Sequence, residues 1–330
     1  AAQTSGKVCR KGNCSAKMFA FILCAYILGI STAADLWSWS HETHKVNIND
    51  LLKQKFEYTD HHSGYGIGED DSLSMQEDPV HHGQYVLSVF YRRGTYSHYN
   101  HNGVACHNGE RCQRGAGFYI QPKSIKDAGH QFISLTLEYE IFFNESFGWQ
   151  RGGKLPGLWG GTRNCSGGRI SDHCFSTRLM WRPDGQGEVY AYVTHDQKAG
   201  VSFNTWCESV HNRELYHQVQ CTDGKGTEIG RGAFHFEKGK WIKLREQVHL
   251  NSRQHEHGYV TLWVNDHAEI HMDDIVIRSQ FNFGIDGILF STFYGGDDHN
   301  WACPADTTTL YRNFRLYTET PHLNHNELVG

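Results

Sequence analysis

The sequence predicts an all-β protein, and three observations support this fold class. Several segments alternate apolar and polar residues with a period of two, which is typical of strands with one buried face. Glycine is abundant (35 residues), proline is scarce (6), and aromatic residues make up 13% of the chain. Many short strands joined by tight turns account for this composition. A single domain is expected, because no internal repeat, low-complexity tract or proline-rich linker interrupts the pattern.

The clearest strand signal lies in residues 132–143, where Ile133, Leu135 and Leu137 alternate with serine, threonine and glutamate. Strands are expected at residues 84–91, 117–120, 132–143, 175–182, 188–194, 241–251, 258–266, 287–296 and 310–317. A polar turn separates 241–251 from 258–266, and this pair resembles the back-sheet hairpin of concanavalin-like jelly rolls. The expected fold is therefore a β-jelly-roll sandwich.

The first residues are typical of a secretory signal. Lys17 precedes Met18, an apolar run covers residues 19–30, and small residues follow at 31–34. The run is shorter than the roughly 20 apolar residues that span a bilayer. We therefore expect a secreted chain that has no membrane partner after cleavage.

The rest of the chain divides by composition. After the signal the sequence is polar and poorly periodic, with room for one short helix, until the alternating pattern begins. We expect an upstream segment (1–17), a signal peptide (18–34), a polar N-terminal extension (35–80), the β-jelly-roll domain (81–320) and a C-terminal tail (321–330).

The cysteines fit an oxidising compartment. Seven of them follow the signal: Cys106, Cys112, Cys165, Cys174, Cys207, Cys221 and Cys303. Close spacing favours the local pairs Cys106–Cys112 and Cys165–Cys174, with Cys207–Cys221 as a less certain third. Cys303 is then left over, either free or replacing one of these partners. Spacing alone leaves the connectivity open.

Charge and motif content argue against several function classes. The net charge is only −5 and no basic stripe is present, so nucleic acid is not an expected partner. An acidic ligand would need locally placed Arg and Lys. The 23 histidines include His41-Glu42-Thr43-His44, which is one residue short of a zinc motif, and we expect neither a metal nor a cofactor. The paired carboxylates that a glycoside hydrolase needs are not found in a Glu-x-Asp-x-x-Glu arrangement.

A predicted β-hairpin carries the chemically most informative residues. Its strands place Ser176 and Arg178 on the same face as Tyr190 and Tyr192. The turn 183–187 suggests a register with Arg182 opposite Glu188, which sets Met180 opposite Tyr190, Arg178 opposite Tyr192 and Ser176 opposite Thr194. Two phenols beside a cation suit an acidic polymer better than a neutral one.

A lysine precedes this hairpin in the segment RGGKLPGLWGG, which we interpret as a glycine-rich apolar loop. Lys154 is followed there by Leu155, Pro156, Leu158 and Trp159. These surroundings could remove water from the amine and lower its pKa.

These residues resemble polysaccharide lyase family 14, which comprises alginate lyases of marine molluscs and glucuronate or alginate lyases of chlorella viruses. The motifs are GGKLPGLWGG, CSGG, CFSTRLMWR, GQGEVYAY and FSTFYGG, in order between about residues 85 and 317. The resemblance implies a β-jelly roll in which one concave sheet forms the substrate cleft. Trp159 stands where the family often has tyrosine.

The resemblance also implies site residues. The catalytic groups would be Lys154, Arg178, Tyr190 and Tyr192, with Ser176, Trp159 and Arg182 binding substrate and Cys165–Cys174 flanking the hairpin. The implied reaction is β-elimination in a 1,4-linked uronate chain, most often mannuronate-rich alginate, by a monomer without a cofactor. Arg178 and Lys154 would neutralise the carboxylate while the tyrosines move protons, or Lys154 would itself be the base. A lyase specific for glucuronan and a non-catalytic uronan-binding lectin are the alternatives.

Overall fold

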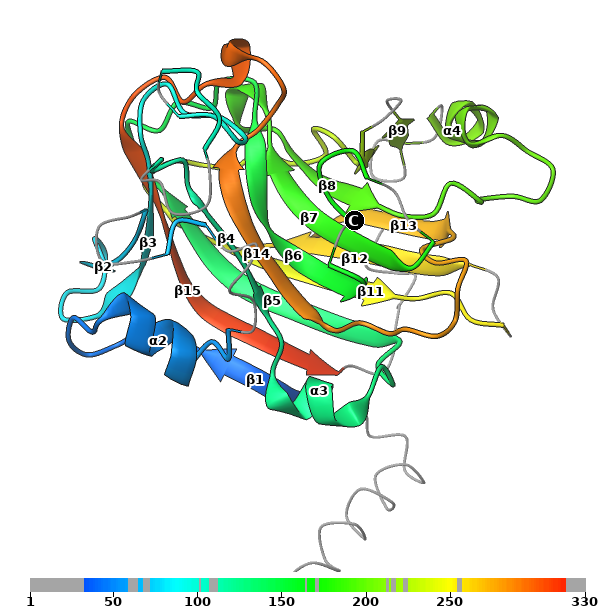
Figure 1. The fold of residues 1–330 in the computed structure, drawn as a ribbon, viewed down its shortest axis with the longest axis horizontal. Helices are drawn as coiled ribbons and strands as arrows, with labels where there is room; N and C mark the ends of the chain where they lie inside the picture. The colour runs from blue at the N-terminus through cyan, green and yellow to red at the C-terminus, as the bar shows by residue number, and fades with distance from the viewer. Residues whose placement is uncertain are drawn as a thin grey trace, which may run out of the picture.

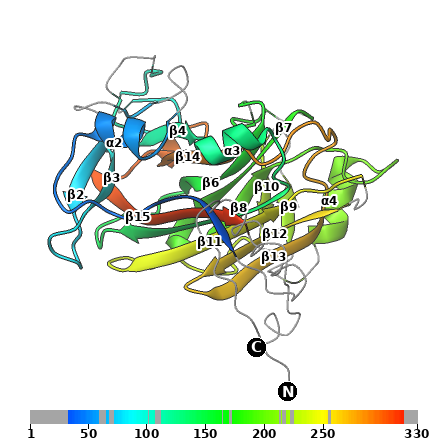
Figure 2. The same cartoon turned by 90° about the horizontal axis from the view of Figure 1, so that it is seen from below.

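The computed structural model describes residues 33–58, 65–67, 72–100, 102–106, 112–163, 165–169, 172–211, 214, 218–221, 225–253 and 257–318. The segments 1–17 and 321–330 and nearly all of the predicted signal lie outside these residues. Two antiparallel sheets pack face to face, and Figures 1 and 2 show them from two sides. This confirms the all-β prediction.

In the described part of the chain, the back sheet has eight strands in the order β13-β12-β11-β5-β15-β3-β2, with β1 paired to β15. Their bounds are β1 (Ala34–Trp39), β2 (Leu73–Glu77), β3 (Tyr85–Tyr91), β5 (Ser134–Phe143), β11 (Trp241–His249), β12 (Gly258–Val264), β13 (His267–Ile275) and β15 (Thr307–Thr318).

The front sheet has seven strands in the order β4-β14-β6-β7-β8-β10-β9, again within the described residues. Their bounds are β4 (Ala116–Ile120), β6 (Gly153–Gly161), β7 (Cys174–Trp181), β8 (Gly187–Tyr192), β9 (Val219–Cys221), β10 (Thr227–Ile229) and β14 (Gly287–Tyr294). Every strand expected from alternation is present with small shifts at its ends.

Short helices lie at the edges of the sandwich (Figure 1). They are α2 (Ile48–Gln54), α3 (Lys123–Ala128) and α4 (Phe203–His211), with the 3₁₀ turns Pro183–Gly185 and His299–Trp301. Among the described residues, the helices are too short and too polar to cross a membrane.

The described residues between 34 and 77 add two strands to the back sheet, and Tyr58 and Tyr65 form bridges to β4 of the front sheet. Strand β1 pairs with β15, and β2 pairs with β3. The short helix expected in this segment is α2, which begins after Asn47 because the Asn47 side chain accepts hydrogen bonds from the N–H groups of Asn49 and Asp50. Strands β1 and β2 were therefore not predicted, because this polar segment lacks a clear alternating pattern.

The core fills the space between the two sheets. Inward-facing side chains of the front sheet, such as Leu155 and Leu179, are fully buried, as are Leu137 and Leu244 of the back sheet. Because side chains alternate along a strand, the neighbours of these core residues point to the outer face of the front sheet. That outer face carries the candidate site.

One buried carboxyl group enters this core from the back sheet. Glu246 of β11 is 1% exposed, and its Oε2 accepts a hydrogen bond of 3.1 Å from the Leu158 N–H of β6. Close by, the Tyr139 hydroxyl donates to the Pro156 carbonyl at 3.1 Å. Both bonds meet β6 at the bulge where its pairing with β7 shifts between Leu155 and Gly157. The back sheet therefore holds the irregular part of β6 in place.

Glu246→Gln should remove part of the pH dependence of stability. Burial raises the pKa of Glu246 from 4.5 to about 8, against hydrogen bonds from Thr177 and Leu158 that lower it. The folded state thus keeps a proton that the unfolded chain releases, so the free energy of unfolding falls as pH rises from about 4.5 to about 8. The neutral amide of the variant has no such fall. Urea unfolding should therefore give wild type and Glu246→Gln the same stability near about pH 5. Near about pH 9 the variant should be more stable than wild type by a few kcal/mol. Parallel pH profiles would contradict this.

Candidate active site

The site is a grid of side chains on the outer face of the front sheet. Strands β6, β7, β8 and β10 set directly opposed residues side by side. The rows across these strands are Lys154–Met180–Glu188, Arg178–Tyr190–Glu228 and Trp159–Ser176–Tyr192. The predicted shared face of the hairpin is therefore present, and β6 adds the lysine and the tryptophan to it.

The register of the hairpin differs from the expected one. Arg178 lies opposite Tyr190, and Ser176 lies opposite Tyr192. The cause is the turn: Arg182 belongs to it, because the Arg182 carbonyl accepts from Gly185 N–H at 3.2 Å and the Arg182 N–H donates to the Gln186 carbonyl at 2.7 Å. The last pair before the turn is therefore Trp181–Gly187 and not Arg182–Glu188, a shift of one residue in each strand. The two shifts together preserve alternation, so the same side chains still share one face.

The segment around Lys154 is a central strand and not the glycine-rich loop expected from its composition. Its glycines allow neighbouring strands to approach closely. A Cβ at Gly157 would lie 1.8 Å from the Thr177 carbonyl oxygen, and one at Gly153 would lie 2.1 Å from the Trp181 ring. Glycine is required here for close packing within a sheet, which a composition-based interpretation cannot separate from loop flexibility.

Lys154 is held in a dehydrated position. Its side chain is 8% exposed, its Nζ lies 3.6 Å from the centre of the Tyr190 ring, and it donates a hydrogen bond of 2.6 Å to Met180 Sδ. Burial lowers the pKa of Lys154 well below 10.5, and the positive charges of Arg178 and Arg182 lower it further. The amine therefore reaches its neutral, basic form at a lower pH than an ordinary lysine.

Arg178 is the cation at the centre of the grid. It is 3% exposed, and its Nη1 donates to the Ser291 Oγ of β14 at 3.2 Å. Its guanidinium carbon lies 5.8 Å from the centre of the Tyr192 ring. Ser291 was not predicted as a site residue, although it lies in the motif FSTFYGG. Arg178 is thus fixed in orientation from the neighbouring strand β14.

The two tyrosines each accept a backbone hydrogen bond. The Gly226 N–H donates to the Tyr190 hydroxyl at 2.9 Å, and the Gly168 N–H donates to the Tyr192 hydroxyl at 3.0 Å. The ring centres are 5.6 Å apart. Burial, and next the neighbouring Tyr192, raise the pKa of Tyr190 above its ordinary value. Tyr190 therefore keeps its proton near neutral pH.

The residues expected to bind substrate lie around this centre with differing partners. The Ser176 Oγ donates to the Cys165 carbonyl at 2.7 Å, which connects β7 to the flanking loop. Trp159 packs edge-on against Tyr119, with ring centres 4.7 Å apart. Trp301, which the sequence did not point to, packs against the cluster of Met180, Tyr190 and Tyr192. A substrate role for Ser176 and Trp159 stays a prediction.

Arg182 takes part in a buried ion cluster. Its Nη2 lies 2.6 Å from both Glu188 Oε1 and Glu228 Oε1, and Arg231 lies 2.9 Å from Glu228 Oε2. Burial raises the pKa of Glu188 to about 7, against the lowering effect of Arg182. These partners hold Arg182 on the same face as Lys154, and a substrate role for Arg182 stays a prediction.

Three disulfides join the cysteines in the local pairs that spacing favours: Cys106–Cys112, Cys165–Cys174 and Cys207–Cys221. Cys303 is free and buried. The loop closed by Cys165–Cys174 supplies both the Cys165 carbonyl to Ser176 and the Gly168 N–H to Tyr192. This disulfide therefore supports the site directly.

Replacing Cys165 and Cys174 by alanine should reduce both stability and activity. Losing a short disulfide loop costs about 2–3 kcal/mol of unfolding free energy. Freeing the Gly168 loop should lower kcat/KM by about tenfold or more, because the Tyr192 hydroxyl loses its positioned donor. The matched control replaces Cys207 and Cys221, which join α4 to β9, and should lose stability but keep kcat/KM. Equal activity in the two double variants would refute a role for the loop.

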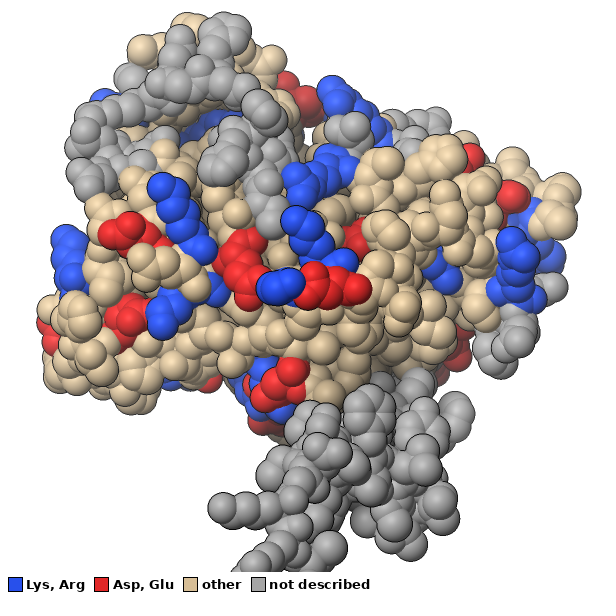
Figure 3. Space-filling view, turned by 60° about the horizontal axis from the view of Figure 1, so that its bottom comes forward, with Lys and Arg blue, Asp and Glu red and all other residues tan. Residues whose placement is uncertain are grey.

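Among the described residues, His, Cys, Asp and Glu do not gather in a group of three or more that could hold a metal ion. Acidic and basic side chains are interspersed over the face seen in Figure 3. Attraction of a polyanion therefore depends on the local cations of the site.

Comparison with known proteins gives a consistent result. The sequence model of a family described as polysaccharide lyase 14 matches residues 79–314. The crystal structure of the marine PL-14 alginate lyase from Aplysia kurodai is similar, with a TM-score of 0.67 and 31% identity over 86% of this chain and 99% of that one. The alginate lyase vAL-1 from Chlorella virus has a TM-score of 0.58 and 20% identity, covering 83% of this chain and 98% of that one.

A curated relative is the protein named exolysin of Paramecium bursaria Chlorella virus 1, 24% identical over 215 residues. The match covers 58% of this chain but only 31% of that protein. The fold and these comparisons define the class of jelly-roll polysaccharide lyases, which confirms the expected fold. Within that class, the chain belongs to the polysaccharide lyase 14 family.

Proposed function

We propose that this protein cleaves 1,4-linked uronate polymers by β-elimination, with mannuronate-rich alginate as its main substrate. The observation that carries the proposal is the dehydrated Lys154 amine beside the buried Arg178 and two hydrogen-bonded phenols. This set of side chains includes positive charge that can neutralise a substrate carboxylate. It also includes groups that can take a proton from the substrate and give one to it. The alginate lyase from Aplysia kurodai supports the substrate class.

In the proposed mechanism, Arg178 binds the carboxylate of the sugar that loses its C5 proton. Neutralising that carboxylate makes the C5 proton more acidic and stabilises the charge that develops on proton removal. Ser291 holds the guanidinium from one side at 3.2 Å. Because Arg178 is buried in low dielectric, its attraction for the carboxylate is stronger than it would be in water.

Lys154 is proposed as the base. Its neutral amine takes the C5 proton, the electron pair forms the C4–C5 double bond, and the C4–O4 bond breaks. A phenol, Tyr192 or Tyr190, gives a proton to the departing O4. The lowered pKa of Lys154 favours this assignment, because an ordinary lysine would be protonated at neutral pH. In the alternative scheme, Tyr192 removes and returns the proton while Lys154 helps to neutralise the carboxylate.

We also propose that the protein is secreted and acts as a monomer. The three disulfides support an oxidising, extracellular location. A uronate polymer is too large to enter cells readily, which is consistent with action outside them.

The test uses protein expressed under oxidising conditions and incubated separately with polymannuronate, polyguluronate and glucuronan. β-Elimination creates a conjugated C4–C5 double bond, so ultraviolet absorbance should rise with polymannuronate. A rise only with glucuronan would assign the substrate to that polymer instead. Folded protein that binds a uronan without any absorbance rise would favour the lectin and refute the lyase.

A further inference from the structure

A third tyrosine lies on the candidate site, contributed by the N-terminal part of the chain. Tyr65 exchanges two backbone hydrogen bonds with Gly117 of β4, at 2.9 and 3.0 Å. A Cβ at Gly117 would lie 2.2 Å from the Tyr65 ring, so the ring rests on the sheet where that glycine has no side chain. Gly117 is directly opposite Ser291, the partner of Arg178. Tyr65 is therefore a neighbour of the central arginine.

Arg114 covers this tyrosine. Its guanidinium carbon lies 3.8 Å from the centre of the Tyr65 ring, which is a stacking distance. The side chain is 9% exposed, and its Nη1 donates to the Ser97 carbonyl. A planar guanidinium held on two sides keeps its donors in a fixed plane, which suits recognition of a carboxylate.

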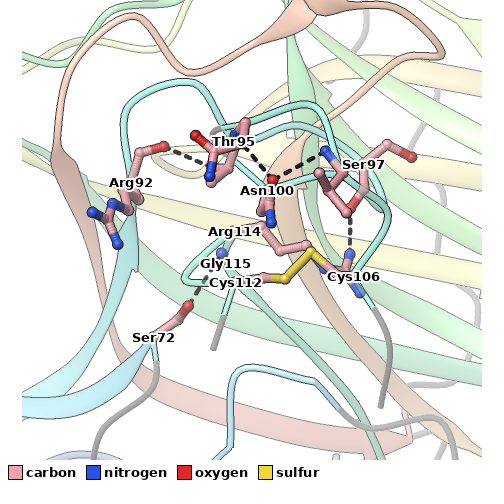
Figure 4. Close-up of a disulfide and its surroundings, with 11 residues drawn as sticks. Ser72, Arg92, Thr95, Ser97, Asn100, Cys106, Cys112, Arg114 and Gly115 are labelled. Atoms are coloured by element: carbon pink, nitrogen blue, oxygen red, sulfur yellow. Dashed lines mark hydrogen bonds between the residues drawn. A yellow bond between two sulfur atoms is a disulfide. The ribbon is translucent and has the colours of Figure 1, made fainter. Parts of the chain in front are cut away.

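A disulfide fixes the loop around Arg114, as Figure 4 shows. The Cys106–Cys112 bond ends two residues before Arg114. The Cys106 N–H also donates to the carbonyl of His98, the residue after Ser97, at 2.6 Å. The disulfide therefore restrains the chain directly before Arg114.

Two further side chains, His98 and Arg169, lie near Arg114. Burial lowers the pKa of His98, and so do the positive charges of Arg114 and Arg169. Arg169 belongs to the loop closed by Cys165–Cys174, the same loop whose Gly168 N–H reaches Tyr192. Arg169 from one disulfide-closed loop and Arg114, two residues after the other disulfide, thus both act on His98. Positive charge at this end of the front sheet attracts a polyanion such as a uronate chain.

We propose that Arg114, stacked on Tyr65 and flanked by His98 and Arg169, forms a second uronate subsite that binds the carboxylate of a sugar adjacent to the one held by Arg178. This inference rests on the proposed function, since a uronate polymer carries one carboxylate on every ring. A protein that binds such a chain along a sheet gains from more than one guanidinium contact. Arg178 would then select the reacting sugar and Arg114 would set its position along the chain.

The test compares wild type with Arg114→Gln on oligomannuronates of increasing length. The variant should lose about tenfold to a hundredfold in kcat/KM on oligomers that fill both subsites, because a charge-assisted contact is removed. On the shortest oligomer that wild type cleaves, the two proteins should be equal. A loss of the same size at every length, or no loss, would overturn the proposal.

Two further variants separate binding from folding. Arg169→Gln changes an exposed side chain and should show a smaller loss with the same dependence on length. Arg92→Gln is the matched control, because this exposed arginine of the same region extends away from Arg114 in Figure 4 and should leave kcat/KM unchanged. If Arg92→Gln lost as much kcat/KM as Arg114→Gln, the loss would come from the lower net positive charge of the region, and the subsite would be rejected.

Calorimetric binding distinguishes failure of the subsite from failure of the proposed function. If wild type releases no unsaturated product from any uronan, the lyase proposal fails. Binding of the oligomers then still tests the subsite: weaker binding by Arg114→Gln supports it, and equal binding overturns it.

Discussion

Replacing Lys154 by methionine should lower kcat/KM on polymannuronate by about 10²–10⁴-fold, the range expected when a positioned proton-transfer group is lost. Methionine fills nearly the same volume and carries no amine. Because Lys154 lies against Met180 and the Tyr190 ring, an apolar side chain fits these contacts. The expected loss therefore reflects chemistry and not packing.

The same variant should be at least as stable as wild type at neutral pH. A lysine with a lowered pKa binds its proton less tightly in the folded state than in the unfolded chain. Between the lowered pKa and the ordinary value of 10.5, stability therefore rises with pH in wild type and not in Lys154→Met. Thermal unfolding at neutral pH measures this directly.

The role of the amine as a base can be separated from a role as a cation. In Lys154→Ala, added methylamine should restore part of the activity if a neutral amine takes the C5 proton. The restored rate should rise with pH as methylamine loses its proton. A Lys154→Met protein that keeps more than about a tenth of the activity, an effect far below that of a proton-transfer group, would remove Lys154 from the mechanism.

Replacing Tyr192 by phenylalanine should also lower kcat/KM by about 10²–10⁴-fold, with little change in stability. The variant removes only the hydroxyl that accepts from Gly168 N–H. Gly168 is partly exposed, so water can replace this partner. In this variant kcat/KM should therefore fall while the melting temperature stays close to that of wild type.

Tyr190→Phe is the matched comparison, and it should lose stability as well. The Gly226 N–H that donates to the Tyr190 hydroxyl is buried, and leaving it without a partner costs about 1–3 kcal/mol. If only Tyr190→Phe loses turnover while Tyr192→Phe remains active, Tyr190 is the proton donor and Tyr192 only shapes the site. Full activity in both would remove the phenols from the mechanism.

Much of the candidate site was predictable because it lies in short stretches of chain. Alternation along two neighbouring strands is enough to place Ser176 and Arg178 on the face of Tyr190 and Tyr192. Close cysteine spacing favoured the three observed disulfides for the same local reason. The composition of the Lys154 segment indicated a dehydrated amine, although it suggested a loop where the protein has a strand.

Other features depend on partners far apart in sequence. The hairpin register differs from the expected one because a shift of two residues in the pairing leaves the alternation unchanged, so the pattern cannot distinguish the two registers. Glycines in β6 indicate a loop when taken alone, and only the Thr177 backbone and the Trp181 ring show why they are needed.

By itself, the sequence determined the fold class, the family and which side chains are candidates for the chemistry, because these follow from local periodicity and from motifs of contiguous residues. The tertiary structure alone decided how the groups act on one another. Ser291 reaches Arg178, Glu246 supports β6 and Arg114 stacks on Tyr65 because sheet formation joins strands that are distant in the chain. The lowered pKa of Lys154 has the same origin, since the desolvation and the arginine charges that cause it arise only in the folded sheet.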